Sequence, residues 1–98
     1  MELSNVPEKY QDEIKKATNL LKNEGCRAVF LFGSMVTGKI HQNSDIDIGI
    51  KGLPPKRFLR VSANLEKESS NKIDLVDFDL CKDLYFLLDS LGEVVEIG

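Results

Sequence analysis

Residues 28–50 decide the fold, and their sequence is AVFLFGSMVTGKIHQNSDIDIGI. The stretch opens with Ala28–Phe32, a continuous apolar run that is typical of a strand buried on both faces. It closes with Asp45–Ile50, in which isoleucine alternates with aspartate and glycine, so that one face of the strand is apolar. Residues 35–44 are polar and leave room for only a short helix. The stretch therefore predicts two strands joined by a compact connection.

Amphipathic helices are predicted on both sides of these strands. One runs from about Pro7 to Glu24 and ends at Gly25, and another runs from Pro55 to about Ser69. Apolar residues spaced by three or four positions give the first helix one apolar face: Val6, Tyr10, Ile14, Ala17 and Leu21. The second helix has a similar stripe: Phe58, Val61 and Leu65.

The C-terminal part of the chain predicts a strand, a helix and a short final strand. The strands are Lys72–Phe78 and Val94–Ile97, and the helix is Asp79–Leu91, with Asp79 as its N-cap. We expect this helix to be buried through its leucines: Leu80, Leu84, Leu87, Leu88 and Leu91. Tyr85 and Phe86 lie off this stripe.

The order of these elements predicts an α/β (α+β) fold, in which a small mixed sheet has helices packed against it. Hydrophobic residues make up 42% of the 98 residues and charged residues 30%, which is the composition of a globular protein. The length predicts a single domain, residues 1–98. A chain this short buries only about two-thirds of its unfolded surface. A homo- or hetero-oligomer would therefore stabilise it.

Charge and cysteine content exclude several classes of protein. The net charge of −3 argues against direct nucleic-acid binding, which depends on lysine and arginine. No apolar run approaches the about 20 residues of a membrane span, and the N-terminus does not resemble a signal peptide. Cys26 and Cys81 lack the spacing of a zinc site or a disulfide framework. These features predict a cytoplasmic domain without a membrane partner.

Asp45 and Asp47 are the first candidate functional residues. At positions i and i+2 of a strand, their carboxylates project from the same face roughly 6.5 Å apart. Burying carboxylates is costly unless they are paired, and Mg²⁺ binds one or two carboxylates together with water and phosphate oxygens. The alternative interpretation is a strand with one solvated face.

Two further features favour a metal and phosphate site. Gly33 and Ser34 follow the first strand, where a glycine lets the backbone approach a ligand and successive amides hold phosphate oxygens. Asp74 lies in the middle of the third apolar strand, where a carboxylate requires a compensating charge. If the three strands are neighbours, the aspartates converge on one patch.

The combination of Gly33-Ser34, Gly38, Ser44-Asp45-Ile46-Asp47 and Asp74 resembles the minimal nucleotidyltransferase (MNT) branch of the polymerase β nucleotidyltransferase superfamily. The resemblance covers nearly the whole chain and implies the polymerase β-like nucleotidyltransferase fold. It implies Mg²⁺-dependent transfer of a nucleoside monophosphate from a nucleoside triphosphate to a hydroxyl, with release of pyrophosphate. Many MNT proteins are antitoxins that bind a HEPN-domain RNase toxin and adenylylate it on tyrosine.

The resemblance also implies roles for individual residues. Asp45, Asp47 and Asp74 would be the catalytic residues and would hold two Mg²⁺ ions, with Asp74 on the ion nearer the acceptor hydroxyl. Gly33 and Ser34 would contact the triphosphate.

The turn after the first strand departs from the family pattern. Many relatives have arginines there, whereas this chain has Met35, Val36 and Thr37. Lys39 would replace part of the missing charge as a nucleotide-binding residue. The departure weakens the expectation of tight nucleotide binding and leaves the expected fold unchanged.

A P-loop is the competing interpretation of the same turn. Residues 33–39 match G-x-x-x-x-G-K, but Ile40 stands where a P-loop requires serine or threonine, and no long helix follows. His41 lies in this polar segment, where solvent exposure explains it. The P-loop interpretation is therefore disfavoured.

The predicted function is transfer of AMP from ATP to a tyrosine of a HEPN-type RNase toxin, by a protein that acts as its antitoxin. The alternative is a catalytically weak homologue that neutralises its partner by binding alone. Transfer to a small molecule is disfavoured, because 98 residues leave little material for a separate acceptor pocket. The sequence leaves open the acceptor, the base of the nucleotide and the oligomeric state.

Overall fold

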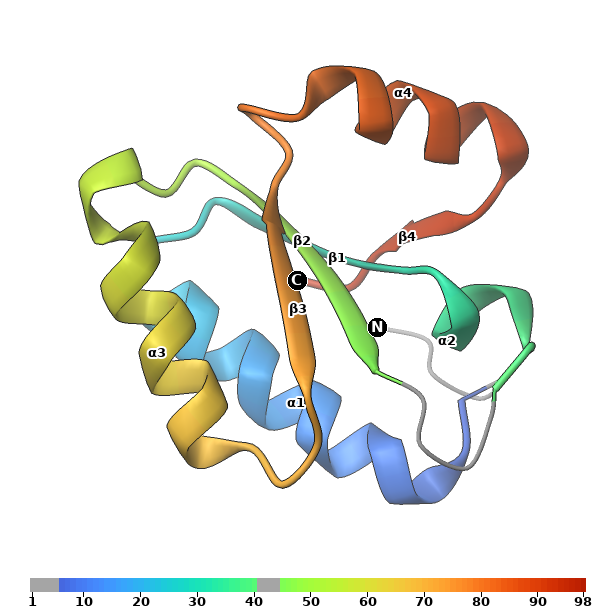
Figure 1. The fold of residues 1–98 in the computed structure, drawn as a ribbon, viewed down its shortest axis with the longest axis horizontal. Helices are drawn as coiled ribbons and strands as arrows, with labels where there is room; N and C mark the ends of the chain where they lie inside the picture. The colour runs from blue at the N-terminus through green and yellow to red at the C-terminus, as the bar shows by residue number, and fades with distance from the viewer. Residues whose placement is uncertain (1–5, 41–44) are drawn as a thin grey trace.

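The computed structural model describes residues 6–40 and 45–98 (Figure 1). His41 and Ser44, which the sequence analysis singled out, lie outside the described residues. The helices are α1 (Glu8–Asn23), α2 (Ser34–Thr37), a 3₁₀ turn (Pro55–Arg57), α3 (Phe58–Glu68) and α4 (Lys82–Leu91). The strands are β1 (Ala28–Phe32), β2 (Ile46–Lys51), β3 (Ile73–Asp77) and β4 (Val94–Glu96).

In the described part of the chain, the strands form a four-stranded mixed sheet in the order β3-β2-β1-β4. β1 is antiparallel to both β2 and β4, whereas β2 and β3 are parallel. A parallel pair requires a crossover connection, which α3 supplies between β2 and β3. The predicted fold class, a small mixed sheet with helices packed against it, is confirmed.

The main core joins α1 and α3 to one face of the sheet. The isoleucines of β2 (Ile46, Ile48 and Ile50) point into it and are fully buried. The predicted apolar faces of both helices are confirmed, because all five residues predicted for the first face are buried, although Val6 precedes α1. In α3, Val61 and Leu65 are buried and Phe58 packs half-buried against the core. This arrangement directs the intervening residues of β2, including Asp47, to the opposite face.

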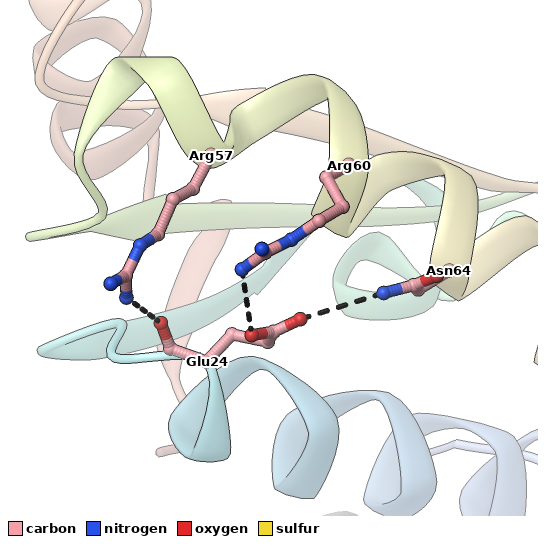
Figure 2. Close-up of polar contacts among 4 residues, drawn as sticks. All are labelled: Glu24, Arg57, Arg60 and Asn64. Atoms are coloured by element: carbon pink, nitrogen blue, oxygen red, sulfur yellow. Dashed lines mark hydrogen bonds and ion pairs between the residues drawn. The ribbon is translucent and has the colours of Figure 1, made fainter.

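Polar contacts also connect α1 to α3, around Glu24 at the end of α1 (Figure 2). Arg57 Nη1 donates to the Glu24 backbone carbonyl at 3.3 Å, Arg60 Nη2 to Oε1 at 3.4 Å and Asn64 Nδ2 to Oε2 at 3.5 Å. Arg60 is exposed, and exposed ion pairs contribute at most about 1 kcal/mol. The contacts fix the orientation of α3 more than they stabilise the fold.

An aromatic cluster occupies the opposite face of the sheet. Phe30, Phe32 and Phe78 are buried there, and ring centroids lie 5.3 Å apart between Phe78 and Tyr85 and 5.4 Å apart between Phe30 and Tyr85. Gly49 allows this packing, because any side chain at Gly49 would overlap the Phe78 ring. The glycine of β2 therefore leaves space for the aromatic cluster.

The predictions for α4 are wrong in two respects. The helix begins at Lys82 after Cys81, and Asp79 does not cap it but accepts a hydrogen bond from the Gly52 N–H at 2.8 Å. Four of the five leucines expected to bury the helix are exposed, with exposed fractions of 69% for Leu80, 36% for Leu84, 56% for Leu87 and 58% for Leu91. The fifth, Leu88, is half-buried.

The face that α4 presents to the sheet explains this difference. Tyr85 and the half-buried Leu88 contact the aromatic cluster, and the other leucines lie away from it. Periodicity identified an apolar stripe, but the packing of Tyr85 against Phe30 and Phe78 determines how the helix is rotated. Phe86, also predicted to lie off the stripe, is 64% exposed.

Cys26 is buried, Cys81 is exposed, and both are free thiols. None of the helices within residues 6–40 and 45–98 is long and apolar enough to cross a membrane.

Candidate active site

Two glycines flank α2, with Gly33 between β1 and α2 and Gly38 directly after α2. Gly33 has φ +73° and Gly38 has φ +82°, a region of backbone conformation that other residues rarely adopt. The amides of Val36 and Thr37 donate to the Gly33 carbonyl at 3.0 and 3.1 Å, and the Gly38 amide closes α2 on the Ser34 carbonyl at 2.9 Å. The backbone at the end of β1 therefore turns sharply over the sheet.

Gly33 is also required by Asp47. A Cβ atom at Gly33 would overlap Asp47 Oδ2 and lie 3.1 Å from Asp47 Cγ. Phe32, the residue before Gly33, is opposite Asp47 in the antiparallel register. The turn at Gly33 therefore lies directly against the Asp47 carboxylate.

The parallel pairing of β2 and β3 brings the aspartates together. Asp47 lies opposite Asp74 in this register, and Asp45 directly precedes β2 on the same face as Asp47. Asp45 and Asp74 have side chains that are 40% and 46% exposed. The convergence expected from the sequence is therefore present, with Gly33 beside it.

Electrostatic repulsion and burial act on Asp47 in particular. Desolvation, followed by repulsion from Asp74 and Asp45, raises the pKa of the Asp47 carboxyl from its ordinary value of 3.8 to about 6. Among the described residues, Asp47 has neither a cation nor a hydrogen-bond donor as a partner. A half-buried carboxylate that has no partner among the described residues and lies beside two others is typical of a site that binds a cation.

Lys72 is the site residue that the sequence analysis missed. Its Nζ atom lies 3.8 Å from Asp45 Oδ2 and 3.8 Å from Asp74 Oδ1. It was predicted only as the first residue of a strand, yet alternation already places it on the same face as Asp74, two positions later. The compensating charge that Asp74 required is therefore a lysine in this structure.

Lys39 does not join the cluster. It is exposed beyond the end of α2, and its N–H donates to Thr37 Oγ1 at 3.4 Å. Within the described part of the chain, no ion pair connects it to the aspartates.

The donor set fits a hard divalent cation in its chemistry, because all three ligands are carboxylate oxygens. Asp47, without a partner among the described residues, supports this fit. As the side chains lie, no group of three or more His, Cys, Asp or Glu residues in the described ranges is arranged to hold one ion. Binding of a metal by all three carboxylates would therefore require side-chain movement.

Comparisons with known proteins concern the fold and the family of the chain. In solved structures, a chain of a toxin–antitoxin crystal structure with AMP-PNP is 25% identical (TM-score 0.60), with 87% of this chain and 69% of that chain covered. A chain of a toxin–antitoxin MntA-HpeT mutant is 27% identical (TM-score 0.55), with 66% and 56% covered. A chain of a second MntA-HpeT mutant is 23% identical (TM-score 0.62), with 87% and 71% covered, and shows a likeness of fold alone.

No curated protein matches the chain. The family described as "Polymerase beta, Nucleotidyltransferase" matches residues 13–95. The match extends from α1 to β4 and includes the elements that carry the three aspartates and the glycine turn. The chain therefore belongs to the polymerase β nucleotidyltransferase family.

Proposed function

We propose that this protein transfers AMP from ATP to a tyrosine hydroxyl of a HEPN-type RNase toxin, and that it is the antitoxin of that toxin. The observation that carries the proposal is the parallel register of Asp47 and Asp74, which gathers three carboxylates beside the Gly33 turn. Two similar chains come from toxin–antitoxin structures, one of them with the ATP analogue AMP-PNP. We place the reaction in the cytoplasm, with the toxin as partner in a hetero-oligomer.

Some of the site residues would bind the nucleotide and its metal ion, and Asp74 would act on the acceptor side. Asp45 and Asp47 would hold the Mg²⁺ that accompanies the triphosphate, and Asp74 would hold a second Mg²⁺ on the acceptor side. When bound, the ions neutralise charge on the attacking and leaving oxygens. Gly33 and Ser34 would place backbone amides against the phosphates, since the first amides of a helix have no acceptor within it.

The transfer itself is an in-line displacement. The tyrosine oxygen forms a bond to the α-phosphorus, and the bond from this phosphorus to the β-phosphate oxygen breaks. Pyrophosphate leaves with the electron pair of that bond. Asp74, at the exposed edge strand β3, lies where it would orient the acceptor hydroxyl and favour loss of its proton.

A second candidate function is neutralisation by binding alone. It is favoured by the lack of arginine in the turn, where Met35 is buried in the core, and by the position of Lys39 away from the aspartates. The three clustered carboxylates favour the enzyme, because a protein that only binds does not require their mutual repulsion.

Mass spectrometry of a co-expressed HEPN toxin distinguishes the two functions. We expect AMP on a toxin tyrosine with the wild-type protein and with Asp83→Asn, an exposed control on α4. Asp74→Asn should abolish the modification while retaining part of the ATP binding, because Asp45 and Asp47 remain. An unmodified toxin that wild type and Asp74→Asn inhibit equally would contradict catalysis and support binding alone.

A further inference from the structure

Lys72 is held close to the carboxylates by the backbone. The Ile46 N–H donates to the Lys72 carbonyl at 2.9 Å, and Ile46 lies opposite Ile73 at the start of the parallel pair. Lys72 therefore occupies a fixed position between the start of β2 and the start of β3. Its side chain begins beside the carboxylates and does not reach them from a distant loop.

The Lys72 ammonium connects two of the three aspartates. It lies at the same distance, 3.8 Å, from Asp45 Oδ2 and from Asp74 Oδ1. Mg²⁺ ions held by Asp45 and by Asp74 would bind oxygens of these carboxylates at about 2.0–2.1 Å, much closer than the ammonium lies. Because a divalent ion at these carboxylates repels the ammonium and competes with it for the same negative charge, binding of the ion favours departure of the ammonium.

We propose that Lys72 is a tethered counter-ion, which neutralises Asp45 and Asp74 in the metal-free protein and which a divalent cation must displace. The inference rests on the proposed function, because it takes these aspartates as metal ligands, and it adds a form of regulation. Free metal ions compete with Lys72 for two carboxylates. A metal that arrives on a triphosphate brings phosphate oxygens of its own, so it depends less on those carboxylates.

The exposure of the groups sets the size of the effect. The side chains are 65% exposed for Lys72, 40% for Asp45 and 46% for Asp74, so both ion pairs are screened by water. An exposed pair changes an equilibrium by about 1.4- to 5-fold. Loss of both pairs should therefore change metal affinity by about 2- to 25-fold.

Calorimetric titration with Mn²⁺ alone tests the proposal. Lys72→Met should lower the Kd for Mn²⁺ by about 2- to 25-fold. Lys72→Arg, which keeps the charge, should stay within about twofold of the wild type. Lys67→Met is the matched control for loss of one positive charge, because Lys67 is exposed on α3 and forms no ion pair in the described part of the chain.

Thermal unfolding separates a counter-ion from a merely structural lysine. In EDTA, Lys72→Met should unfold at a lower temperature than wild type, and added Mn²⁺ should raise its Tm by more than it raises the wild-type Tm. A structural role would lower the Tm equally with and without Mn²⁺, and this result would overturn the inference.

The titration has two further outcomes that overturn it. Equal or weaker Mn²⁺ binding by Lys72→Met would reject the displacement of Lys72 while leaving the metal site intact. No Mn²⁺ binding by either wild type or Lys72→Met would reject the metal site itself, and with it the proposed function.

Discussion

Replacing Asp47 with asparagine should stabilise the metal-free protein at neutral pH. The Asp47 pKa is about 6 in the folded state, compared with an ordinary value of 3.8, so folding disfavours its charged form. This difference corresponds to an upper limit of about 3 kcal/mol. Because Asp47 is only half-buried, solvent screening reduces the expected gain to about 1–2 kcal/mol. Asparagine has nearly the same shape and fits beside Gly33.

The pH dependence has a definite sign. The folded state binds the Asp47 proton more tightly than the unfolded chain, so this contribution to wild-type stability is fully present below pH 3.8. The contribution is lost as the pH rises to about 6. Above that pH, Asp47 causes no further change in the free energy of unfolding. The advantage of Asp47→Asn over wild type should therefore grow across this pH range and then level off.

Thermal or urea unfolding in EDTA at a series of pH values measures this effect. A gain of 1–2 kcal/mol corresponds to a Tm rise of roughly 4–16 °C in a domain of this size. Asp12→Asn, an exposed aspartate on α1, is the control for loss of one negative charge. A gain that is absent at pH 7, or equal at pH 4 and pH 7, would refute the reasoning from burial and repulsion.

Two further predictions concern the glycines. Gly49→Ala should cost about 1–3 kcal/mol in urea unfolding, because the fully buried Phe78 ring would have to move; a change below about 0.5 kcal/mol would show that the ring adapts freely. Gly33→Ala should weaken ATP binding in calorimetry more than Ser34→Ala does, since it strains the turn and displaces Asp47, whereas Ser34→Ala removes one hydroxyl. Equal affinities for these two variants would place the phosphates elsewhere.

The sequence predicted the elements that carry the site because their patterns are local. Strict alternation at Asp45–Ile50 fixes which side chains face the core, and the apolar run at Ala28–Phe32 indicates a strand buried on both faces. The structure confirms both strands. The convergence of Asp47 with Asp74 followed once the strands were taken as neighbours.

Tertiary contacts explain what the sequence did not predict. The rotation of α4 depends on Tyr85 meeting rings from β1 and from the end of β3. Position 33 requires glycine partly because a side chain there would overlap the Asp47 carboxylate. Asp47 lies on another strand, so no local sequence motif contains this contact. The Asp79 carboxylate accepts a hydrogen bond from the distant Gly52 N–H and does not cap the helix that follows.

The parallel pairing of β2 and β3 has a consequence for folding kinetics. Asp74 repels Asp45 and Asp47 only after these strands have paired across the α3 crossover, a contact distant in sequence. A divalent ion bound between the paired strands would accelerate folding if the pairing is already formed in the transition state, and would only slow unfolding if it forms later. The dependence of the folding and unfolding rates on metal concentration would therefore report when this strand pair forms, without any mutation.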